Sequence, residues 1–217
     1  MIRVRDLEFQ YDKSDFRLRV ANLQIADRER VAIVGPSGSG KTTLLNLFAG
    51  IATPHRGSVE TAGQDVSSMS DRARRQFRVR HVGLVFQEFE LLEYLTVLDN
   101  VLLPYFLTPA LKLDDDVRAR AVRLAEGVEI DDKLGRNVAR LSQGERQRVA
   151  LCRALLTDPS VILADEPTGN LDPSSKMRVV DLLLERAQDA NATLVAVTHD
   201  REVAERFDRV LDMGTLQ

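Results

Sequence analysis

Short apolar runs alternate with longer stretches of helical periodicity along most of the chain. Uninterrupted apolar runs predict strands buried on both faces at Arg30–Gly35, Val82–Phe86, Val161–Ala164 and Leu194–Val197. Apolar residues three and four positions apart predict helices at Lys41–Ala49, Val97–Leu103, Val117–Gly127, Gln143–Leu156 and Ser174–Gln188. Buried strands that alternate with helices favour a parallel sheet in an α/β domain.

Two regions depart from this alternation. Near the N-terminus, apolar residues that alternate with polar ones predict half-buried strands through Ile2, Val4, Phe16, Leu18 and Val20. The stretch from Gln87 to Pro159 holds no convincing strand pattern, so it is expected to form a helical subdomain inserted between two strands of the sheet.

Composition places the chain among ordinary soluble globular proteins. It has 217 residues, of which 44% are hydrophobic and 29% charged, enough for one domain with a sizeable core. The net charge of −3 gives no general attraction for phosphate backbones, so nucleic-acid binding is not expected. The basic run from Arg72 to Arg80 is interpreted as a solvated helix face.

No membrane span or signal peptide is predicted. A transmembrane helix needs about 20 mostly apolar residues in a row, and the apolar runs here are far shorter. Any role at a membrane is therefore expected to come through a partner. The single cysteine, Cys152, excludes an internal disulfide framework and lies in an apolar helical pattern, which predicts a core position.

The sequence "GPSGSGKT" at Gly35–Thr42 matches the Walker A pattern, with a predicted strand before it and a helix after it. Glycines let successive backbone N–H groups turn toward one anion, and the following helix adds its positive N-terminal end. Lys41 would bring its charge to the β- and γ-phosphates, and Thr42 would offer its hydroxyl to Mg²⁺. The residues expected around the phosphates are Gly35, Ser37, Gly38, Ser39, Gly40, Lys41, Thr42 and Thr43.

Two carboxylates end the predicted strand in "VILADE". The carboxyl ends of parallel strands form the edge at which open α/β sheets bind ligands. Asp165 suits the Mg²⁺ shell, and Glu166, one residue later, is placed to polarise an attacking water. A pair of solvated acids would be the alternative if the Walker A motif were absent.

The start of the predicted helix at "LSQGE" raises a separate question. Ser142 and Glu145 match a capping box, which explains both residues without any ligand. It does not explain Gly144, because a glycine in a helix is destabilising. A helix start with bare backbone is a good seat for an anion. Since the chain already has one triphosphate site, this second seat is expected to serve the nucleotide of another subunit.

The ordered set "GPSGSGKTT", "VFQE", "LSQGE", "VILADEPTGNLD" and "VTHD" resembles the ATP-binding-cassette (ABC) ATPase family over essentially the whole chain. The resemblance implies a P-loop NTPase fold, with a RecA-like parallel core and N-terminal antiparallel strands in residues 1–86 and 160–217. Residues 87–159 would form the helical subdomain. In this family the position of "LSQGE" is called the signature motif. The resemblance also implies a homodimer that holds two ATPs, each between the Walker A loop of one subunit and the signature helix of the other.

The same resemblance implies roles for single residues outside the phosphate loop. Gln87 would contact Mg²⁺ and sense the membrane partner, Asp172 would lie at the dimer interface, and His199 would hold the γ-phosphate. Tyr11 would stack on adenine, with a packing role as the alternative and Phe9 as its rival.

The signature departs from the family's common Leu-Ser-Gly-Gly-Gln at two positions. Gln143 replaces the first glycine and Glu145 replaces the final glutamine, while Ser142 and Gly144 are kept. A carboxylate near a polyanion would weaken the contact between subunits unless Glu145 stays in the capping box.

Three functions are compatible with an ABC ATPase. The chain most resembles the separate ATPase subunit of the lipoprotein-releasing and macrolide-export branch. Such a subunit would use ATP and Mg²⁺ and pair with membrane-spanning subunits at the cytoplasmic face of the plasma membrane. Its Gln87–Phe106 stretch would receive a short helix of the partner. The absence of a guanine-reading N-K-x-D motif favours ATP over GTP.

The alternatives are a regulatory ATPase that acts through a membrane partner without moving cargo, and a soluble ABC ATPase that acts on nucleic acid or ribosomes. The second is less favoured, because the chain lacks a coiled-coil insertion, a second cassette and a basic extension.

Overall fold

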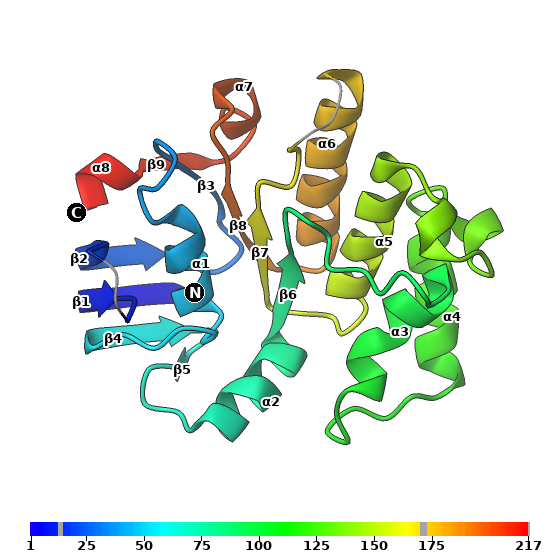
Figure 1. Ribbon diagram of the computed structural model, residues 1–217, viewed down its shortest axis with the longest axis horizontal. Helices are drawn as coiled ribbons and strands as arrows, with labels where there is room; N and C mark the ends of the chain where they lie inside the picture. The colour runs from blue at the N-terminus through cyan, green and yellow to red at the C-terminus, as the bar shows by residue number, and fades with distance from the viewer. Residues whose placement is uncertain (13–14, 170–172, 217) are drawn as a thin grey trace.

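The computed structural model describes residues 1–12, 15–169 and 173–216, which form two sheets with helices around them (Figure 1). One sheet is antiparallel, with the strand order β2-β1-β4-β5. Its strands are β1 (Ile2–Gln10), β2 (Arg17–Ile25), β4 (Arg56–Thr61) and β5 (Gln64–Asp65). The other is parallel, with the order β6-β7-β8-β3-β9. Its strands are β3 (Arg30–Val34), β6 (Val82–Val85), β7 (Val161–Asp165), β8 (Thr193–Val197) and β9 (Arg209–Asp212).

The helices occupy different parts of the molecule. In Figure 1, α3, α4 and α5 gather beyond β6, whereas α1 lies between the two sheets. The α-helices are α1 (Lys41–Phe48), α2 (Asp71–His81), α3 (Val97–Phe106), α4 (Asp115–Glu126), α5 (Gln143–Leu155), α6 (Pro173–Asp189), α7 (Arg201–Ala204) and α8 (Met213–Leu216). Two short 3₁₀ helices, Asp131–Lys133 and Val138–Arg140, precede α5.

Alternate residues of the parallel strands face two different cores. Val195 and Val197 of β8 pack with α1 and the antiparallel sheet. Ala196 packs on the opposite face with residues of α3, α5 and α6, as do Ala32 of β3 and Ala164 of β7. Because strand side chains alternate between faces, a strand covered on both sides must be apolar throughout. This explains the uninterrupted apolar runs.

The paired register brings those three alanines into one row across the sheet. Ala196 lies opposite Ala32 on one side and Ala164 on the other, and none of the three is exposed to solvent. This row therefore carries small side chains, while their neighbours Ile33, Leu163 and Val195 fill the other core.

The predicted fold class is confirmed, with differences at the sheet margins. The four predicted buried strands are present as β3, β6, β7 and β8, and the five predicted helices are present as α1, α3, α4, α5 and α6. The pattern did not indicate β4, β5 and β9, which are short or half-exposed. The proposed boundaries of the helical subdomain stay a prediction.

Two further sequence expectations concern single features. Cys152 is fully buried, and burial raises the pKa of its thiol to about 12. The basic run forms α2, whose Arg72, Arg75 and Arg80 are exposed. Arg78 instead donates to the carbonyl of Gly50 at 2.9 Å. In the part of the chain that the structure describes, each helix is too short or too polar to cross a bilayer.

Candidate nucleotide-binding site

The loop between β3 and α1 has the backbone geometry of an anion seat. Gly38 and Gly40 have φ angles of 77° and 94°, a left-handed region that favours glycine. A Cβ on Gly40 would lie only 2.7 Å from the Phe16 ring. Helix α1 then begins without a side-chain cap. Its first-turn N–H groups are therefore left for an external acceptor.

Lys41 closes this loop from inside. Its ammonium nitrogen Nζ donates to the carbonyl oxygens of Gly35 at 2.8 Å and Pro36 at 2.9 Å. The residue is buried, with only 8% of its surface exposed. Because these hydrogen-bond acceptors are neutral, an incoming phosphate would add a negatively charged acceptor for the ammonium group.

The carboxylate of Asp165 faces the same loop from the end of β7. Burial raises its pKa, the hydroxyl of Thr42 and the charge of Lys41 lower it, and the neighbouring Glu166 carboxylate raises it again, with a raised pKa as the net result. Its Oδ1 atom is buried without a hydrogen-bond partner. A buried carboxylate oxygen next to a hydroxyl is the oxygen-donor chemistry that Mg²⁺ prefers, so the residues present fit that ion.

Glu166 and His199 are brought together by neighbouring strands. Glu166 follows β7 with a φ of 45°, and its backbone N–H donates to the carbonyl of Val197 in β8 at 3.0 Å. Its Oε1 atom lies 2.9 Å from Nδ1 of His199. The His199 side chain is 74% exposed and that of Glu166 only 14%. A left-handed non-glycine residue costs about 1–3 kcal/mol, which is a feature of functional turns.

A cavity of about 340 Å³ joins Lys41, Asp165 and Glu166, whereas Gly35 and His199 line a different cavity. Its lining comes from residues between β1 and β2, the phosphate loop with the start of α1, and the carboxyl ends of the parallel strands. The lining residues are Tyr11, Phe16, Ser37, Gly38, Gly40, Lys41, Thr42, Thr43, Gln87, Asp165, Glu166 and Val197. Most of the residues predicted for the phosphates, the metal ion and the base therefore share one cavity.

Tyr11 lies at the mouth of the cavity and Phe9 does not. The Tyr11 hydroxyl is 3.2 Å from Oγ1 of Thr43, and 44% of the residue is exposed. Phe9 is buried and meets the Tyr11 ring edge-on, with centroids 4.8 Å apart. The structure thus separates the packing residue from the residue at the cavity.

Phe16 is a cavity residue that sequence reasoning assigned to a strand. Strand β2 begins one residue later, at Arg17. The ring lies against Gly40 and tilts toward Tyr11, with ring centroids 6.3 Å apart. A turn residue next to an alternating pattern is easily included in that pattern, and only its contact with the phosphate loop distinguishes it.

The signature segment does not line this cavity. Ser142 caps α5: its Oγ accepts from the N–H of Glu145 at 3.4 Å, and its own N–H donates to Oε2 of Glu145 at 2.7 Å. That N–H lowers the pKa of Glu145, as does the charge of Lys133, whose Nζ lies 3.6 Å away. Glu145 is therefore held in the capping box. Ser142 and Gln143 are exposed to solvent.

Gly144 has no packing reason inside this chain to be glycine. A Cβ added there would meet no atom within 4 Å, and the φ angle is not left-handed. Its bare backbone is therefore open to something outside the described residues. Asp172, the other residue predicted at a subunit interface, lies outside the residues that the structure describes.

Comparison with known proteins shows the family to which the chain belongs. Residues 18–169 match the family model described as ABC transporter. The chain belongs to the ABC transporter family. It is 41% identical over 218 residues to the lipoprotein-releasing system ATP-binding protein LolD of Pseudomonas fluorescens, covering 98% of this chain and 94% of that protein. It is 42% identical over 216 residues to the macrolide export ATP-binding/permease protein MacB of Rhodopirellula baltica, covering 98% of this chain but 32% of that protein.

A solved structure supports the same placement. The dimeric post-hydrolysis state of the ATP-binding cassette MJ0796, bound to ADP and Pi, superimposes with a TM-score of 0.87 at 32% identity. The match covers 98% of this chain and 94% of that one. The ABC fold predicted from the ordered motifs is thus confirmed, and the roles of the individual site residues stay predictions.

Proposed function

We propose that this chain is the ATP-hydrolysing subunit of an ABC transporter and works as a homodimer. The observation that carries the proposal is the separation of its two anion seats. The phosphate loop opens into a cavity with Asp165 and Glu166, whereas the bare backbone at Gly144 starts a helix that lines a different part of the surface. Two copies related by a two-fold axis would bring each seat onto the other copy's nucleotide.

The chemistry assigned to the cavity is attack of water on the γ-phosphorus of ATP. A bond forms between the water oxygen and phosphorus, the bond to the β,γ-bridging oxygen breaks, and the water proton passes to Glu166. His199 holds that carboxylate through the 2.9 Å contact. Lys41 stabilises negative charge on the phosphates. Thr42, Asp165 and Gln87 would hold Mg²⁺, which neutralises phosphate charge when bound.

Glu166→Gln tests this assignment. The amide keeps the size of the side chain but cannot accept the proton, so hydrolysis should fall by at least about a hundredfold. ATP binding should persist, and light scattering with Mg-ATP should detect a stable dimer. Hydrolysis at the parent rate would remove Glu166 as the base, and a monomer under saturating ATP would argue against the shared site.

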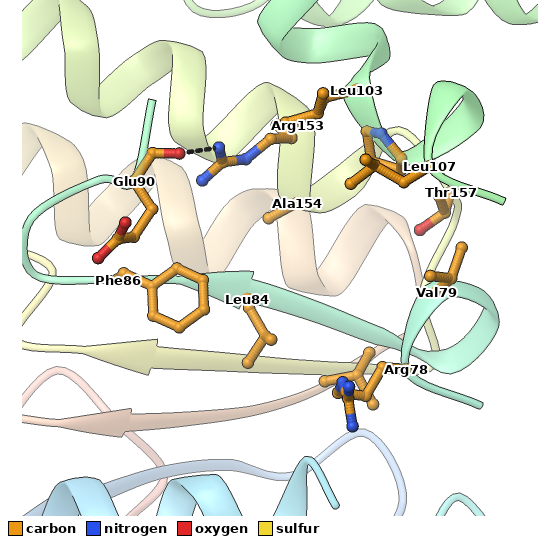
Figure 2. A pocket seen from close by; sticks show the side chains of 12 residues that line it. Arg78, Val79, Leu84, Phe86, Glu90, Leu103, Leu107, Arg153, Ala154 and Thr157 are labelled. Atoms are coloured by element: carbon orange, nitrogen blue, oxygen red, sulfur yellow. Dashed lines mark hydrogen bonds between the residues drawn. The ribbon is translucent and has the colours of Figure 1, made fainter. Parts of the chain in front are cut away.

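The transport branch is proposed from the relatives, LolD and MacB, whose names describe lipoprotein release and macrolide export. A chain of this kind would lie at the cytoplasmic face of the plasma membrane, held there by separate membrane-spanning subunits. An apolar groove supports the partner contact. It encloses about 250 Å³ next to β6, between α2, α3 and α5 (Figure 2).

The groove is wider than the predicted Gln87–Phe106 stretch. Residues that line it are Arg78, Val79, Val82, Leu84, Phe86, Glu90, Leu103, Pro104, Leu107, Arg153, Ala154 and Thr157. Most of these side chains are apolar, and Arg78, Glu90 and Arg153 add charged groups to the lining. A short amphipathic helix from a membrane subunit fits such a groove, since its apolar face would be buried while polar side chains beside that face could meet the charged groups.

Site-specific crosslinking tests the groove. The sole cysteine, Cys152, is buried, so Leu107→Cys at the groove and Arg19→Cys as an exposed control on β2 would each carry one accessible thiol. A thiol-linked photocrosslinker at residue 107 should capture an integral membrane protein in native membranes, and one at residue 19 should not. Equal capture at both positions would remove the groove from the proposal.

A further inference from the structure

The loop that begins the Gln87 segment has an unusual backbone. We call residues 86–91 the Gln87 loop. Within it, Phe89 and Glu90 have φ angles of 60° and 49°, both in the left-handed region that costs non-glycine residues free energy. The turn closes through Phe89 N–H to the carbonyl of Phe86 at 3.0 Å. Two consecutive left-handed residues need support from outside the loop.

Arg153 of α5 supplies that support. Its Nη2 donates to the carbonyl of Phe89 at 2.5 Å, and its Nη1 donates to the carbonyl of Glu90 at 2.5 Å. Figure 2 shows the guanidinium reaching from α5 to Glu90, with that bond drawn as a dashed line. A guanidinium has a rigid fork of donors that can hold two acceptors at once, whereas an ammonium is a point charge. The two carbonyl oxygens thus accept from the two terminal nitrogens of one guanidinium group.

The electrostatics show what this contact costs. Burial lowers the pKa of the Arg153 guanidinium, and the Glu90 carboxylate partly offsets this. A partly desolvated cation is held mainly by backbone carbonyls, so losing the fork would leave both carbonyls without their donors. The conformation of the turn therefore depends on the hydrogen bonds from Arg153.

The position of Arg153 connects two parts of the site. Helix α5 begins next to Ser142 in the signature, and Arg153 lies in its last turn. At 1.5 Å per residue, the helix carries the signature backbone and Arg153 on one rod roughly 20 Å long. Gln87 lines the nucleotide cavity, at the other end of the loop that Arg153 holds. Directly after the loop, buried Asn100 of α3 donates to the carbonyl of Leu92 at 3.1 Å.

We propose that Arg153 is a positioning residue for ATP hydrolysis: it fastens the Gln87 loop to the signature helix, so that both move as one unit against the phosphate loop. The inference rests on the proposed function, because it needs Gln87 to act at the nucleotide. Groove occupancy would act on the same unit, since Glu90 and Arg153 both line the groove.

Arg153→Lys is the principal test, with Gln87→Ala as the partner in a double-mutant cycle. Lysine keeps the charge and the stem but holds one carbonyl at a time. We expect kcat to fall about tenfold, because small displacements of a positioning group have effects of this order or larger. The KM for ATP should change by less than about threefold, since the phosphate loop is untouched. In the Gln87→Ala background, the same change should lower kcat less than twofold.

Arg118→Lys is the matched control, since Arg118 is exposed on α4 in the same group of helices. It should leave kcat and both halves of the cycle unchanged. Hydrogen exchange gives a readout that does not need turnover. Arg153→Lys should speed amide exchange in residues 86–91 and leave the phosphate-loop amides unchanged. If Arg153→Lys fails to fold, Arg153→Gln is used instead, because its neutral amide leaves no buried charge and cannot hold both carbonyls as the guanidinium does, and the cycle is repeated with that variant.

Each outcome decides the inference. A tenfold loss that persists in the Gln87→Ala background, a kcat equal to the parent, or unchanged exchange in residues 86–91 would overturn it. A Gln87→Ala variant with full turnover would overturn it as well, because nothing would remain to position. If the parent chain hydrolyses no ATP, the proposed function fails, and the exchange measurement still decides whether Arg153 holds the loop.

Discussion

At the scale of single residues, the nucleotide cavity keeps charges that the folded chain alone does not satisfy. The ammonium group of Lys41 donates hydrogen bonds to the loop carbonyls of Gly35 and Pro36. The Oδ1 atom of Asp165 is buried and accepts no hydrogen bond from the described residues. Buried charges are stable only when paired or coordinated. These residues therefore trade stability of the free protein for affinity toward a phosphate and a cation.

Asp165→Asn should reveal that trade. Because burial raises the pKa of Asp165 in the fold, the charged form is disfavoured there, and stability is lost as pH rises through the raised value. Removing the charge should raise the Tm of the nucleotide-free protein at pH 7 by roughly 2–4 °C, the shift that about 1 kcal/mol gives in a chain of this size. The measurement is thermal unfolding without Mg²⁺.

The matched measurement adds Mg²⁺ and ATP. They should raise the Tm of the parent chain and have a much smaller effect on Asp165→Asn, since the metal ligand is gone. The advantage of asparagine should also shrink as pH falls toward the ordinary aspartate pKa. A lower Tm for Asp165→Asn at pH 7 would contradict the view that this carboxylate is an unsatisfied group.

Residues that belong to a motif could be predicted, whereas residues that act by contact could not. The spacing and type of the glycines and Lys41 predict a phosphate loop, and the structure places Gly38, Gly40 and Lys41 at one cavity. Phe16 and Arg153 belong to no phosphate-binding pattern. Their places at the phosphate loop and the Gln87 loop depend on chain segments far away in sequence, which local patterning does not encode.

At the scale of elements, the first turn of α5 contains both a stabilising capping box and a destabilising glycine. The capping box satisfies the N–H groups of Ser142 and Glu145, and a cap of this kind stabilises a helix by about 1 kcal/mol. Gly144 inside the same turn gives part of that back. The capping box therefore stabilises the start of the helix, although packing within the chain does not require glycine at position 144.

Gly144→Ala should separate folding from assembly. A methyl group meets open space in this chain, so stability should be unchanged or higher by roughly 0.4–1 kcal/mol. ATPase activity should nevertheless fall about a hundredfold if a second copy's phosphates approach that backbone. Denaturant unfolding and steady-state hydrolysis measure the two effects.

Gly135→Ala is a matched control, because a Cβ there also meets nothing within 4 Å. It should leave ATPase activity unchanged, with the same unchanged or slightly higher stability. Full activity in Gly144→Ala would mean that the bare backbone faces solvent in the working protein as it does in the single chain.

Elements that are buried on both faces were predictable, and those at the margins were not. A strand such as β8 is apolar at every position because two cores cover it, which leaves an unmistakable pattern. Strand β4 is exposed at its first residues, and β5 has only two residues. Their positions follow from pairing with β1 and β4 rather than from their own sequences.

At the scale of the whole molecule, one chain carries two halves of a site that do not meet. The cavity with the phosphate loop includes no signature residue, and the capped start of α5 stands open to solvent. Sequence order could predict both halves, but their union depends on a second chain, whose placement no intramolecular pattern specifies. The proposed dimer is thus a property of the pair.

Mixing two inactive variants tests this. Lys41→Ala should lose the phosphate loop, and Gly144→Asp should block the lent helix start. A heterodimer of the two still contains one complete site. Equal mixing should therefore restore roughly a quarter of parent turnover, since half of the random dimers are mixed and each has one intact site of two.

The control mixes Lys41→Ala with the double variant Lys41→Ala/Gly144→Asp, which leaves no intact phosphate loop in any dimer. It should show no recovery. Recovery in the control, or none in the test mixture at concentrations where dimers form, would contradict a site shared between chains.

The row of three alanines across the parallel sheet has a further consequence for the architecture. Ala32, Ala196 and Ala164 each carry only a methyl group on this face, whereas Ile162 and Leu194, two residues earlier in β7 and β8, carry larger side chains in the same core. The covering helices have least side-chain volume beneath them along the alanine row. Close-packed interiors transmit small changes in volume rather than absorbing them. A larger side chain at any of the three positions would therefore have to displace a covering helix.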